Sequence, residues 1–430
     1  MFGRDLINRT QLRTIPEDSM QYRPLLVGAL ALAVALASSS ATVQPAAAAG
    51  DTILFGAPVS LTGSLTKEGH LTQEGYDVWK DYVNAHGGLK VGNKTYKVDI
   101  KYYDDESKND TSAQLAERLI DQDHVNFLLG PYGSGTSFTV AGIAERKKMP
   151  MVEGNGAAER IFNQGFKYTF GVLSPARRYL EGILEMARSQ KPSAQSVAIT
   201  AASDAFSQEV AQGAAAWASS HGMKVVYNNK YPDTATDVSS LVSALKATNP
   251  DVILNAGHLQ DALLVQKALR DQNVSAKAYG YSVGPDTPDF ANSLGKDAND
   301  VFGGAQWSES VKYKGAPGFM QSSAEYAKAI ESRYHHHADY HNAESTAACL
   351  AFQYAIQRAG SLDPEKVRDA LAKLDVTTFY GIIKFDPRGL NLYKPMVVNQ
   401  IQGGSLVTVW PKYTANAKPV YPTPPWGQRK

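Results

Sequence analysis

Short apolar runs alternate with amphipathic segments along most of the chain, and this alternation predicts an α/β fold. Residues 52–57 and 98–103 have the composition of strands, and apolar side chains recur at helical spacing over residues 72–86 between them. The same alternation continues to residue 152. Strands that alternate with helices predict a parallel sheet with helices on both faces, because each parallel neighbour needs a crossover connection.

The pattern restarts beyond residue 174, which predicts a second lobe of the same kind. A helix is expected over residues 175–190, a strand over 196–200 and a helix over 206–221. After residue 301 the pattern returns to helices, and two strand-like segments follow near residue 400. We therefore predict two doubly wound parallel-sheet lobes.

The first fifty residues have the pattern of an export signal. Residues 25–37 are thirteen consecutive uncharged residues, fewer than the roughly 20 that a membrane-spanning helix needs. Arginines precede this run and small residues follow it, which predicts a signal peptide and N-terminal extension over residues 1–49, cleaved near Ala49, and a mature chain in the periplasm. Met1 and Met20 are both candidate starts, and a buried helix is the alternative interpretation of the apolar run.

Composition narrows the function classes. The chain has 43 Lys and Arg against 42 Asp and Glu, so it lacks the basic excess of a nucleic-acid-binding protein and we predict no nucleic-acid partner. The 22 Tyr, 14 Phe and 5 Trp residues exclude disorder over most of the length. A single cysteine, Cys349, excludes an intramolecular disulfide and a thiolate metal cage.

The common enzyme motifs are missing from the sequence. It contains no G-x-S-x-G nucleophile elbow, no phosphate-binding loop and no H-E-x-x-H zinc motif. We therefore predict no catalytic residue, no cofactor and no metal. One alternative stays open, because His337 and His341 would share a face if they lay on one helix and could then bind a metal. We favour the interpretation that this cluster of His335, His336, His337 and His341 forms the polar end of a helix.

Three loops that follow predicted strands of the first lobe are small and rich in hydroxyl groups. They are residues 60–64, 130–136 and 153–157. In open α/β sheets, ligands bind beyond the carboxyl ends of the strands, where helix N-termini present free N–H groups. Ser134 and Thr136 precede a predicted helix and add hydroxyl donors. This chemistry suits a carboxylate held by neutral donors.

Several of these segments together resemble the periplasmic branched-chain amino-acid-binding proteins. The resemblance rests on residues 53–63, 83–89 and 129–134 and extends over residues 51–412. It implies a type I solute-binding protein, in which two lobes joined by three crossovers close on a ligand and deliver it to an ABC permease in the inner membrane. A monomer is expected.

The resemblance also implies where the lobes lie in the sequence. The first lobe would comprise residues 51–173 and 302–380, and the second would comprise residues 174–301 and 381–412. The proline-rich tail, residues 413–430, is expected to be extended and loosely ordered.

Site residues follow from the same resemblance, position by position. Ser134 would bind the ligand carboxylate, assisted by backbone groups of the loop after the next strand, and an aromatic wall would come from the second lobe. The implied ligand-binding residues are Tyr132, Ser134, Asn155, Gly156, Ala157, Phe206, Asn255 and Ser282.

Two departures from the family pattern bear on the ligand. Amino-acid binders place an acidic side chain near position 282 and a threonine near position 157, whereas this chain has Ser282 and Ala157. Because a buried ammonium group without a countercharge is costly, we expect a small carboxylate without an amine, an aromatic or related organic acid. A branched-chain amino acid or an amide stays open, since Asp286 or Glu344 could supply the charge. A ligand-sensing receptor domain is the alternative from another class, although no membrane anchor or effector domain is evident.

Overall fold

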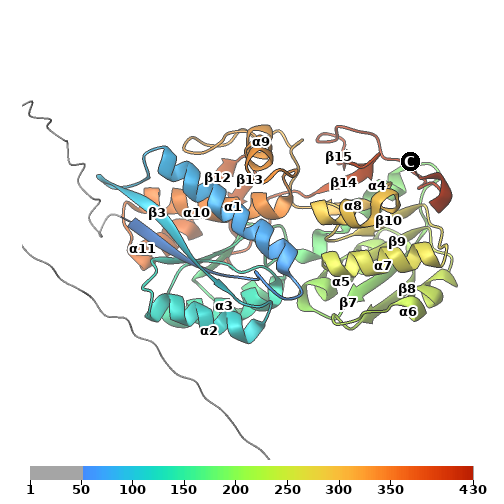
Figure 1. Cartoon of the computed structure of the whole chain (residues 1–430), viewed down its shortest axis with the longest axis horizontal. Helices are drawn as coiled ribbons and strands as arrows, with labels where there is room; N and C mark the ends of the chain where they lie inside the picture. Colours follow the sequence, from blue (N-terminus) through green and yellow to red (C-terminus); the bar gives the residue numbers. More distant parts are fainter. Residues whose placement is uncertain (1–51, 430) are drawn as a thin grey trace, which may run out of the picture. The chain divides into compact units, whose positions relative to one another are not determined.

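Two β-sheets form the centres of two lobes in the computed structural model, which describes residues 52–429 (Figure 1). Both sheets are mostly parallel and are covered by helices, so the predicted α/β class with two doubly wound lobes is confirmed. The predicted signal peptide, its cleavage near Ala49 and both candidate starts lie outside the described residues.

The first sheet has six strands in the order β2-β3-β1-β4-β5-β6. Its neighbours are parallel except for the edge pair β2 and β3. The strands are β1 (Thr52–Val59), β2 (Leu89–Val91), β3 (Lys94–Asp104), β4 (Phe127–Leu129), β5 (Met151–Glu153) and β6 (Thr169–Gly171). The helical segments are α1 (Thr66–Ala85), α2 (Asn109–Asp121), α3 (Ser134–Lys147) and the 3-10 helix η1 (Glu159–Gln164).

The second sheet has seven strands in the order β15-β14-β11-β10-β9-β7-β8, with β14 and β15 antiparallel at one edge. The strands are β7 (Ser196–Ala202), β8 (Lys224–Tyr231), β9 (Val252–Ala256), β10 (Ala278–Tyr281), β11 (Phe302–Ala305), β14 (Val397–Gln402) and β15 (Ser405–Trp410). The helical segments are η2 (Ala176–Arg178), α4 (Glu181–Ser189), α5 (Ala205–Ser220), α6 (Ser239–Lys246), α7 (Leu259–Asp271), α8 (Pro288–Leu294) and η3 (Gly295–Ala298).

Late segments of the chain complete the first lobe. They are α9 (Ser323–Tyr334), α10 (Tyr340–Ala359), α11 (Pro364–Ala372) and a hairpin of β12 (Asp375–Thr378) and β13 (Gly381–Lys384). Helix α10 packs against α1 and β5, so residues that are about 270 positions apart in sequence lie side by side (Figure 1). Almost every side chain of α10 up to Ile356 is buried, which explains its lack of a polar face.

The chain crosses between the lobes three times. The crossovers lie between β6 and β7, between β11 and α9, and between β13 and β14. Strand β11 pairs with β10 and β14 of the second sheet. We therefore assign residues 302–305 to the second lobe, whereas the sequence placed the boundary before residue 302.

An aromatic cluster forms part of the core of the first lobe. The ring centroid of Phe55 in β1 lies 5.4 Å from the ring centroids of Trp79 in α1 and Phe352 in α10. It lies 5.7 Å from that of Phe127 in β4. These rings come from both helices and from two neighbouring strands. Each buried aromatic ring contributes a large apolar area, so this cluster fixes α1 and α10 against the sheet.

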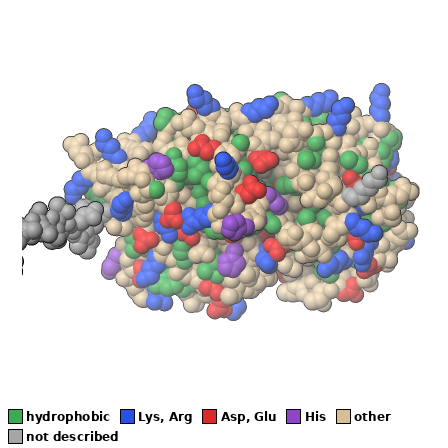
Figure 2. Space-filling model, turned by 45° about the horizontal axis from the view of Figure 1, so that its top comes forward, with side chains coloured by type: hydrophobic (Ala, Val, Ile, Leu, Met, Phe, Trp, Pro, Cys, Tyr) green, Lys and Arg blue, Asp and Glu red, His purple; other side chains and the backbone are tan. Residues whose placement is uncertain are grey.

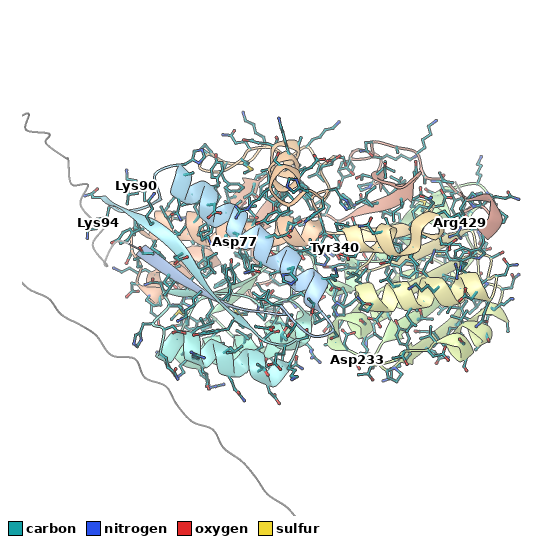
Figure 3. All side chains as sticks on the ribbon, viewed as in Figure 1. Asp77, Lys90, Lys94, Asp233, Tyr340 and Arg429 are labelled. Carbon is teal, nitrogen blue, oxygen red and sulfur yellow. The ribbon has the colours of Figure 1, made fainter. Side chains whose placement is uncertain are left out.

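The proline-rich tail is not loosely ordered, contrary to expectation. Trp426 of the 3-10 helix η4 (Trp426–Gln428) is 8% exposed and donates from Nε1 to the Val274 carbonyl at 2.7 Å. The Arg429 guanidinium lies 3.6 Å from the centroid of the Trp426 ring and 4.7 Å from that of Tyr279 (Figure 3). Composition signalled an extended segment, but these two side chains anchor it to the second lobe.

The surface carries both signs of charge in close alternation. Figure 2 shows Lys and Arg side chains interspersed with Asp and Glu on the displayed face, as the net charge of +1 suggests. Among residues 52–429, no helix combines the length and the apolar character that a membrane crossing requires.

Candidate functional site

A small cavity lies between the two lobes, at the carboxyl ends of the strands of the first sheet. It encloses about 10 Å³, roughly the space that one water molecule occupies, so its walls must separate before a larger molecule enters. We call it the inter-lobe cavity. Its lining residues are Tyr132, Ser134, Asn155, Tyr179, Phe206, His258, Val283, Tyr340, His341 and Glu344.

Ser134 stands in the first turn of α3, where a helix presents unpaired N–H groups. The sequence pattern placed Ser134 before this helix, whereas the helix begins at Ser134 itself, which places its hydroxyl at the positive end of the helix dipole. Gly133 precedes it with φ +91°, a conformation that glycine adopts without strain. Ser134 Oγ accepts a hydrogen bond from the Ala158 N–H at 3.1 Å. Within residues 52–429 its hydroxyl donates no hydrogen bond, so it can donate one to a ligand.

Asn155 brings an unpaired acceptor to the cavity. Its backbone N–H donates to Glu153 Oε1 at 2.6 Å, and its side-chain Nδ2 donates to Ser345 Oγ at 2.8 Å. Its Oδ1 atom is buried and has no hydrogen-bond partner within residues 52–429. A buried acceptor of this kind costs about 1–3 kcal/mol unless a ligand donor satisfies it.

Gly156 and Ala157 do not line the cavity, although they belong to the predicted loop. A Cβ atom at Gly156 would lie 2.4 Å from Ser137 Oγ, so only glycine fits there. The Ala157 carbonyl accepts the Ala176 N–H at 2.9 Å. In this structure the two residues hold the loop against α3 and the first crossover.

Aromatic side chains from both lobes form the walls. Phe206 of α5 lies edge-on to Tyr179, with ring centroids 5.0 Å apart. Tyr179 in turn lies 6.4 Å from Tyr340 of α10, which sits between elements of the two lobes (Figure 3). Tyr132 completes this set of aromatic walls, with its ring centroid 5.6 Å from that of the His258 imidazole. Such walls favour a flat or branched apolar body.

A positive charge reaches the cavity through His258. Burial alone would lower the pKa of this imidazole, but Asp204, whose carboxylate lies 3.7 Å away, raises it to about 9. Despite its own burial, Asp204 has a pKa below the ordinary value because of the same partner. The Nδ1 atom of His258 lies 3.0 Å from the Tyr132 hydroxyl. His258 is therefore protonated at neutral pH and belongs to the second lobe, opposite Ser134.

Glu344 places a carboxyl group in the same cavity. It is 1% exposed, and its Oε2 atom has no hydrogen-bond partner in the described part of the chain. Burial raises the pKa of Glu344 well above its usual range, although the nearby Lys394 opposes the shift. Burial likewise lowers the pKa of Lys394 to about 7. Burial therefore favours the neutral form of Glu344, and a ligand cation nearby would favour the ionised form.

Two predicted residues lie away from the inter-lobe cavity. Asn255 is buried at the end of β9 and donates to Thr200 Oγ1 at 3.0 Å and to the Tyr231 hydroxyl at 2.9 Å. Ser282 exchanges two hydrogen bonds with the backbone of Gly257, both at 2.9 Å. Both side chains tie the carboxyl ends of second-sheet strands together.

The sequence did not single out Tyr179, His258, Val283 or Tyr340 as site residues. Each is a lone residue next to a crossover or a helix start, and only the folded chain brings them beside Ser134. Glu344 had been considered as a source of charge, and the structure places it in the inter-lobe cavity. Asp286, the other candidate, lies in a different cavity.

The histidine cluster does not lie on one helix. Helix α9 ends at Tyr334 and α10 begins at Tyr340, so His337 precedes the helix that carries His341. His341 Nδ1 lies 2.6 Å from Asp339 Oδ1, and His336 Nε2 lies 3.1 Å from Glu74 Oε2. No group of three or more His, Cys, Asp or Glu side chains suited to a metal ion occurs in the described residues.

A wider groove leads to the inter-lobe cavity from outside. It has a volume of about 960 Å³ and is lined by both lobes, from Ser64 and Asn109 on one side to Asp233 and Lys267 on the other. Ser134 and His258 line both this groove and the inter-lobe cavity. A solute that passes along this groove would reach Ser134 and His258 before the other residues of the inter-lobe cavity.

Polar contacts hold the lobes together around the cavity. The buried Glu68 of α1 accepts the Leu259 N–H at the start of α7 through Oε1, at 3.0 Å. Next to it, Lys67 forms an exposed ion pair with Asp289 of α8 at 2.8 Å. Both contacts join the first lobe to the second.

Comparisons with known proteins agree with this architecture. A family model described as periplasmic binding protein matches residues 52–405. The Leu/Ile/Val-binding protein homolog 8 of Brucella suis is 26% identical over 418 residues, covering 93% of this chain and 99% of the relative.

Solved structures with similar folds have low sequence identity. The leucine-binding protein LivK of Thermotoga maritima aligns with a TM-score of 0.74 and 21% identity, over 83% of this chain and 97% of that one. A solute-binding protein of an ABC transporter from Rhodopseudomonas palustris, in complex with 3,4-dihydroxybenzoic acid, aligns with a TM-score of 0.71 and 18% identity, over 84% and 96%. With a family model that spans most of its length, the chain belongs to the periplasmic binding protein family.

Proposed function

We propose that the protein is the substrate-binding component of an ABC importer, which captures a small carboxylate in the periplasm and passes it to a membrane permease. The observation that carries this proposal is the pairing, across one inter-lobe cavity, of Ser134 at a helix N-terminus with the protonated His258. Both groups favour an anion, and they come from different lobes. An anion that bridges them binds the closed state better than the open one.

The carboxylate subsite is built from donors. The Ser134 oxygen accepts the Ala158 N–H, and its hydroxyl hydrogen can donate to the carboxylate. The first turn of α3 adds the positive end of its dipole. A carboxylate held in this way replaces water by fixed donors and needs no arginine or lysine.

The apolar body of the ligand would lie between aromatic rings. Tyr132 and Tyr340 come from the first lobe, whereas Phe206 comes from the second and Tyr179 from the first crossover. Lobe closure brings these rings to opposite sides of the ligand. An aromatic or related organic acid suits this enclosure, since offset and edge-on ring contacts add to the burial of apolar area.

The far end of the ligand should carry a hydrogen-bond donor. Asn155 Oδ1 and Glu344 Oε2 are buried acceptors without partners among residues 52–429. A ring hydroxyl would satisfy one of them without requiring an ionised Glu344. A hydroxylated aromatic acid is therefore the ligand class that the cavity supports best.

A branched-chain amino acid is the second candidate, and Glu344 is the observation that favours it. An ammonium group next to this carboxyl would stabilise its ionised form, and Glu344 would then supply the countercharge that Ser282 does not. The two candidates differ in one respect. The amino acid needs the negative charge of Glu344, whereas the hydroxy acid needs only a hydrogen-bonding group.

A binding panel tests the proposal. The purified protein is titrated by calorimetry with benzoate, 4-hydroxybenzoate, leucine, isoleucine and butan-1-ol, and each mixture is examined for turnover. Saturable binding of an acid, with no product formed, is the expected result. If no carboxylate binds, or if the bound compound is consumed, the proposal is wrong.

Two variants locate and classify the ligand. Ser134→Ala should weaken the ligand about 10- to 100-fold, the cost of a lost hydrogen bond to a charged group. Thr139→Ala, which removes a hydroxyl from the same helix outside the cavity, is the matched control and should leave affinity unchanged. Glu344→Gln should weaken an amino acid about 100-fold or more. The same change should weaken a hydroxy acid less than about tenfold, because glutamine keeps an acceptor.

A further inference from the structure

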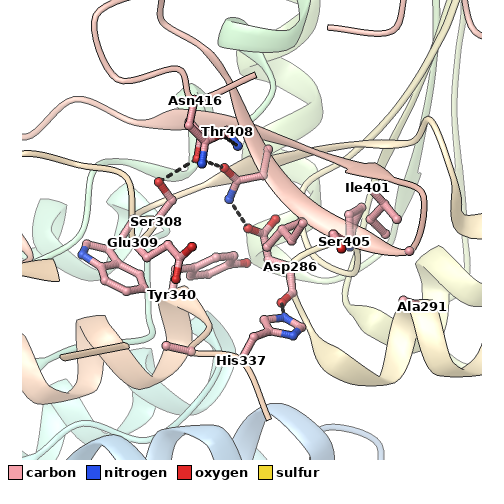
Figure 4. Close-up of a pocket in the computed structure, with 16 residues that line it drawn as sticks. Asp286, Ala291, Ser308, Glu309, His337, Tyr340, Ile401, Ser405, Thr408 and Asn416 are labelled. Atoms are coloured by element: carbon pink, nitrogen blue, oxygen red, sulfur yellow. Dashed lines mark hydrogen bonds between the residues drawn. The ribbon is translucent and has the colours of Figure 1, made fainter. Parts of the chain in front are cut away.

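A second cavity lies beside the crossovers, away from Ser134. It has a volume of about 300 Å³ and is walled by both lobes and by the crossover segment after β11. Figure 4 shows Asp286 among its lining residues, between Tyr340 and Ser405. We call it the crossover cavity. At 300 Å³ it falls at the lower end of the range for small-molecule sites.

Asp286 brings a carboxylate oxygen without a protein partner to this cavity. The side chain is 2% exposed. Its Oδ1 atom accepts a hydrogen bond from Asn399 Nδ2, and within residues 52–429 no hydrogen bond to Oδ2 is formed. A Cβ atom at position 303 would lie 2.4 Å from Oδ2, so Gly303 makes room for the carboxylate. The Oδ2 atom thus offers the cavity a carboxylate acceptor on a side chain that is otherwise buried.

The other polar side chains along this wall are already satisfied by one another. Thr408 Oγ1 forms hydrogen bonds with both Asn399 Oδ1 and Ser308 Oγ, each at 2.8 Å (Figure 4). Ser308 Oγ also lies 2.9 Å from Ser310 Oγ. This network fixes Asn399, which in turn fixes Asp286. The unpaired oxygen is therefore held in a defined place instead of being free to turn away.

The remainder of the wall is largely apolar. Pro285, Ala291, Trp307, Ala338, Ile401 and Leu406 contribute to it. A hydrated metal ion would not suit such surroundings, because hard cations retain oxygen ligands and water. A cationic nitrogen on a short hydrocarbon chain would suit both the carboxylate and the apolar wall.

We propose that the crossover cavity is a second binding site, which takes a small primary-ammonium compound on Asp286. The ammonium group donates to the Oδ2 atom, and its hydrocarbon part lies against Ile401 and Leu406. This site is separate from the inter-lobe cavity, and Tyr340 is the residue common to both walls. Neither ligand needs the other to be present.

Charged groups face Asp286 from several elements. Burial raises the pKa of its carboxyl to about 7, and Asp339 adds to the shift while His341 opposes it. Glu309 of the crossover and His337 of the loop before α10 also line the cavity. Binding is therefore measured at pH 8, where the Asp286 carboxyl is ionised and an alkylamine remains protonated.

Calorimetric titration of the full chain with n-butylammonium chloride tests the proposal, with butan-1-ol as the uncharged analogue. The amine should bind saturably and the alcohol should not. Asp286→Asn should weaken the amine by at least about tenfold, since it removes the charge but keeps the size. Asp289→Asn, which removes a charge from the neighbouring α8 outside the cavity, is the matched control. Because the ion pair of Asp289 with Lys67 is exposed, this variant should change the affinity for the amine less than about fivefold.

A second variant guards against misfolding of Asp286→Asn. Ser405 is exposed at the rim of the cavity, so Ser405→Trp should block entry without disturbing the core. Loss of amine binding in this variant, with an unchanged melting temperature, supports the site. The proposal is overturned if the wild type does not bind the amine, if the alcohol binds equally well, or if Glu344→Gln abolishes amine binding, which would place the amine in the inter-lobe cavity.

Discussion

Removing the Glu68 side chain should weaken ligand binding although Glu68 does not line the inter-lobe cavity. Glu68 lies in the first lobe and is 1% exposed, and its Oε1 accepts the Leu259 N–H of the second lobe at 3.0 Å. Because Leu259 is the first residue of α7, this N–H has no partner within the helix. In Glu68→Ala, lobe closure would bury the Leu259 N–H unpaired.

The size of the effect follows from this geometry. A buried hydrogen bond to a charged group is worth about 1.5–3 kcal/mol, and closure must now occur without it. Since the ligand binds the closed state, the cost of closure reduces its apparent affinity directly. We therefore expect the dissociation constant of Glu68→Ala to rise about 10- to 100-fold. Glu68→Gln keeps the acceptor oxygen and should recover most of the loss.

The adjacent ion pair provides the control. Lys67 and Asp289 also join the two lobes, at 2.8 Å, but their side chains are 53% and 37% exposed. Exposed ion pairs contribute little, so Lys67→Ala should change the dissociation constant less than about fivefold.

Calorimetric titration of the wild type, Glu68→Ala, Glu68→Gln and Lys67→Ala with the acid found by the panel measures these effects. Small-angle scattering of the ligand-free proteins reports the open fraction, which should increase in Glu68→Ala. Equal affinity of Glu68→Ala and the wild type, or a larger loss in Lys67→Ala, would refute the assignment of Glu68 as a closure contact.

Three further predictions concern stability. The Asp204 carboxylate raises the pKa of His258 to about 9. The pairing of His258 with Asp204 should therefore stabilise the fold fully below about pH 6.5, and this stabilisation should be lost as the pH rises through 9. Urea unfolding measured across this pH range would detect the change. Gly156→Ala should destabilise the fold by about 1–3 kcal/mol because the new Cβ would clash with Ser137 Oγ. Gly142→Ala places its Cβ in open space on α3 and should not destabilise the fold. Thermal unfolding of the two variants measures the difference. Trp426→Ala should release the tail, so that carboxypeptidase removes it faster than from the wild type while the melting temperature falls by a few degrees at most.

Local sequence pattern predicted the regular elements well where a segment pairs with its immediate neighbours. The helix expected over 206–221 is α5 (Ala205–Ser220), and the strand expected over 196–200 lies within β7 (Ser196–Ala202). The spacing of apolar residues reflects which faces of a helix or strand are buried. Each of these segments is long enough for that spacing to be recognised. The helix expected over 175–190 is divided instead into η2 and α4, because this stretch also serves as a crossover.

The site was predictable only in part. Tyr132, Ser134, Asn155 and Phe206 line the inter-lobe cavity, since a loop after a parallel strand must reach the same edge of its sheet. His258 could not be identified in this way, because its charge depends on Asp204, which lies 54 positions earlier in the sequence.

The sequence alone determined that this chain builds two α/β lobes, because the spacing of apolar residues is a local property that each helix and strand carries by itself. It also determined the small loop with Ser134 at the start of a helix. Tertiary structure alone decided that Glu344, His258 and Tyr340 surround that loop, and that Trp426 anchors the tail. Burial and charge pairing depend on which distant segments meet, and the three crossovers, not the local pattern, decide that.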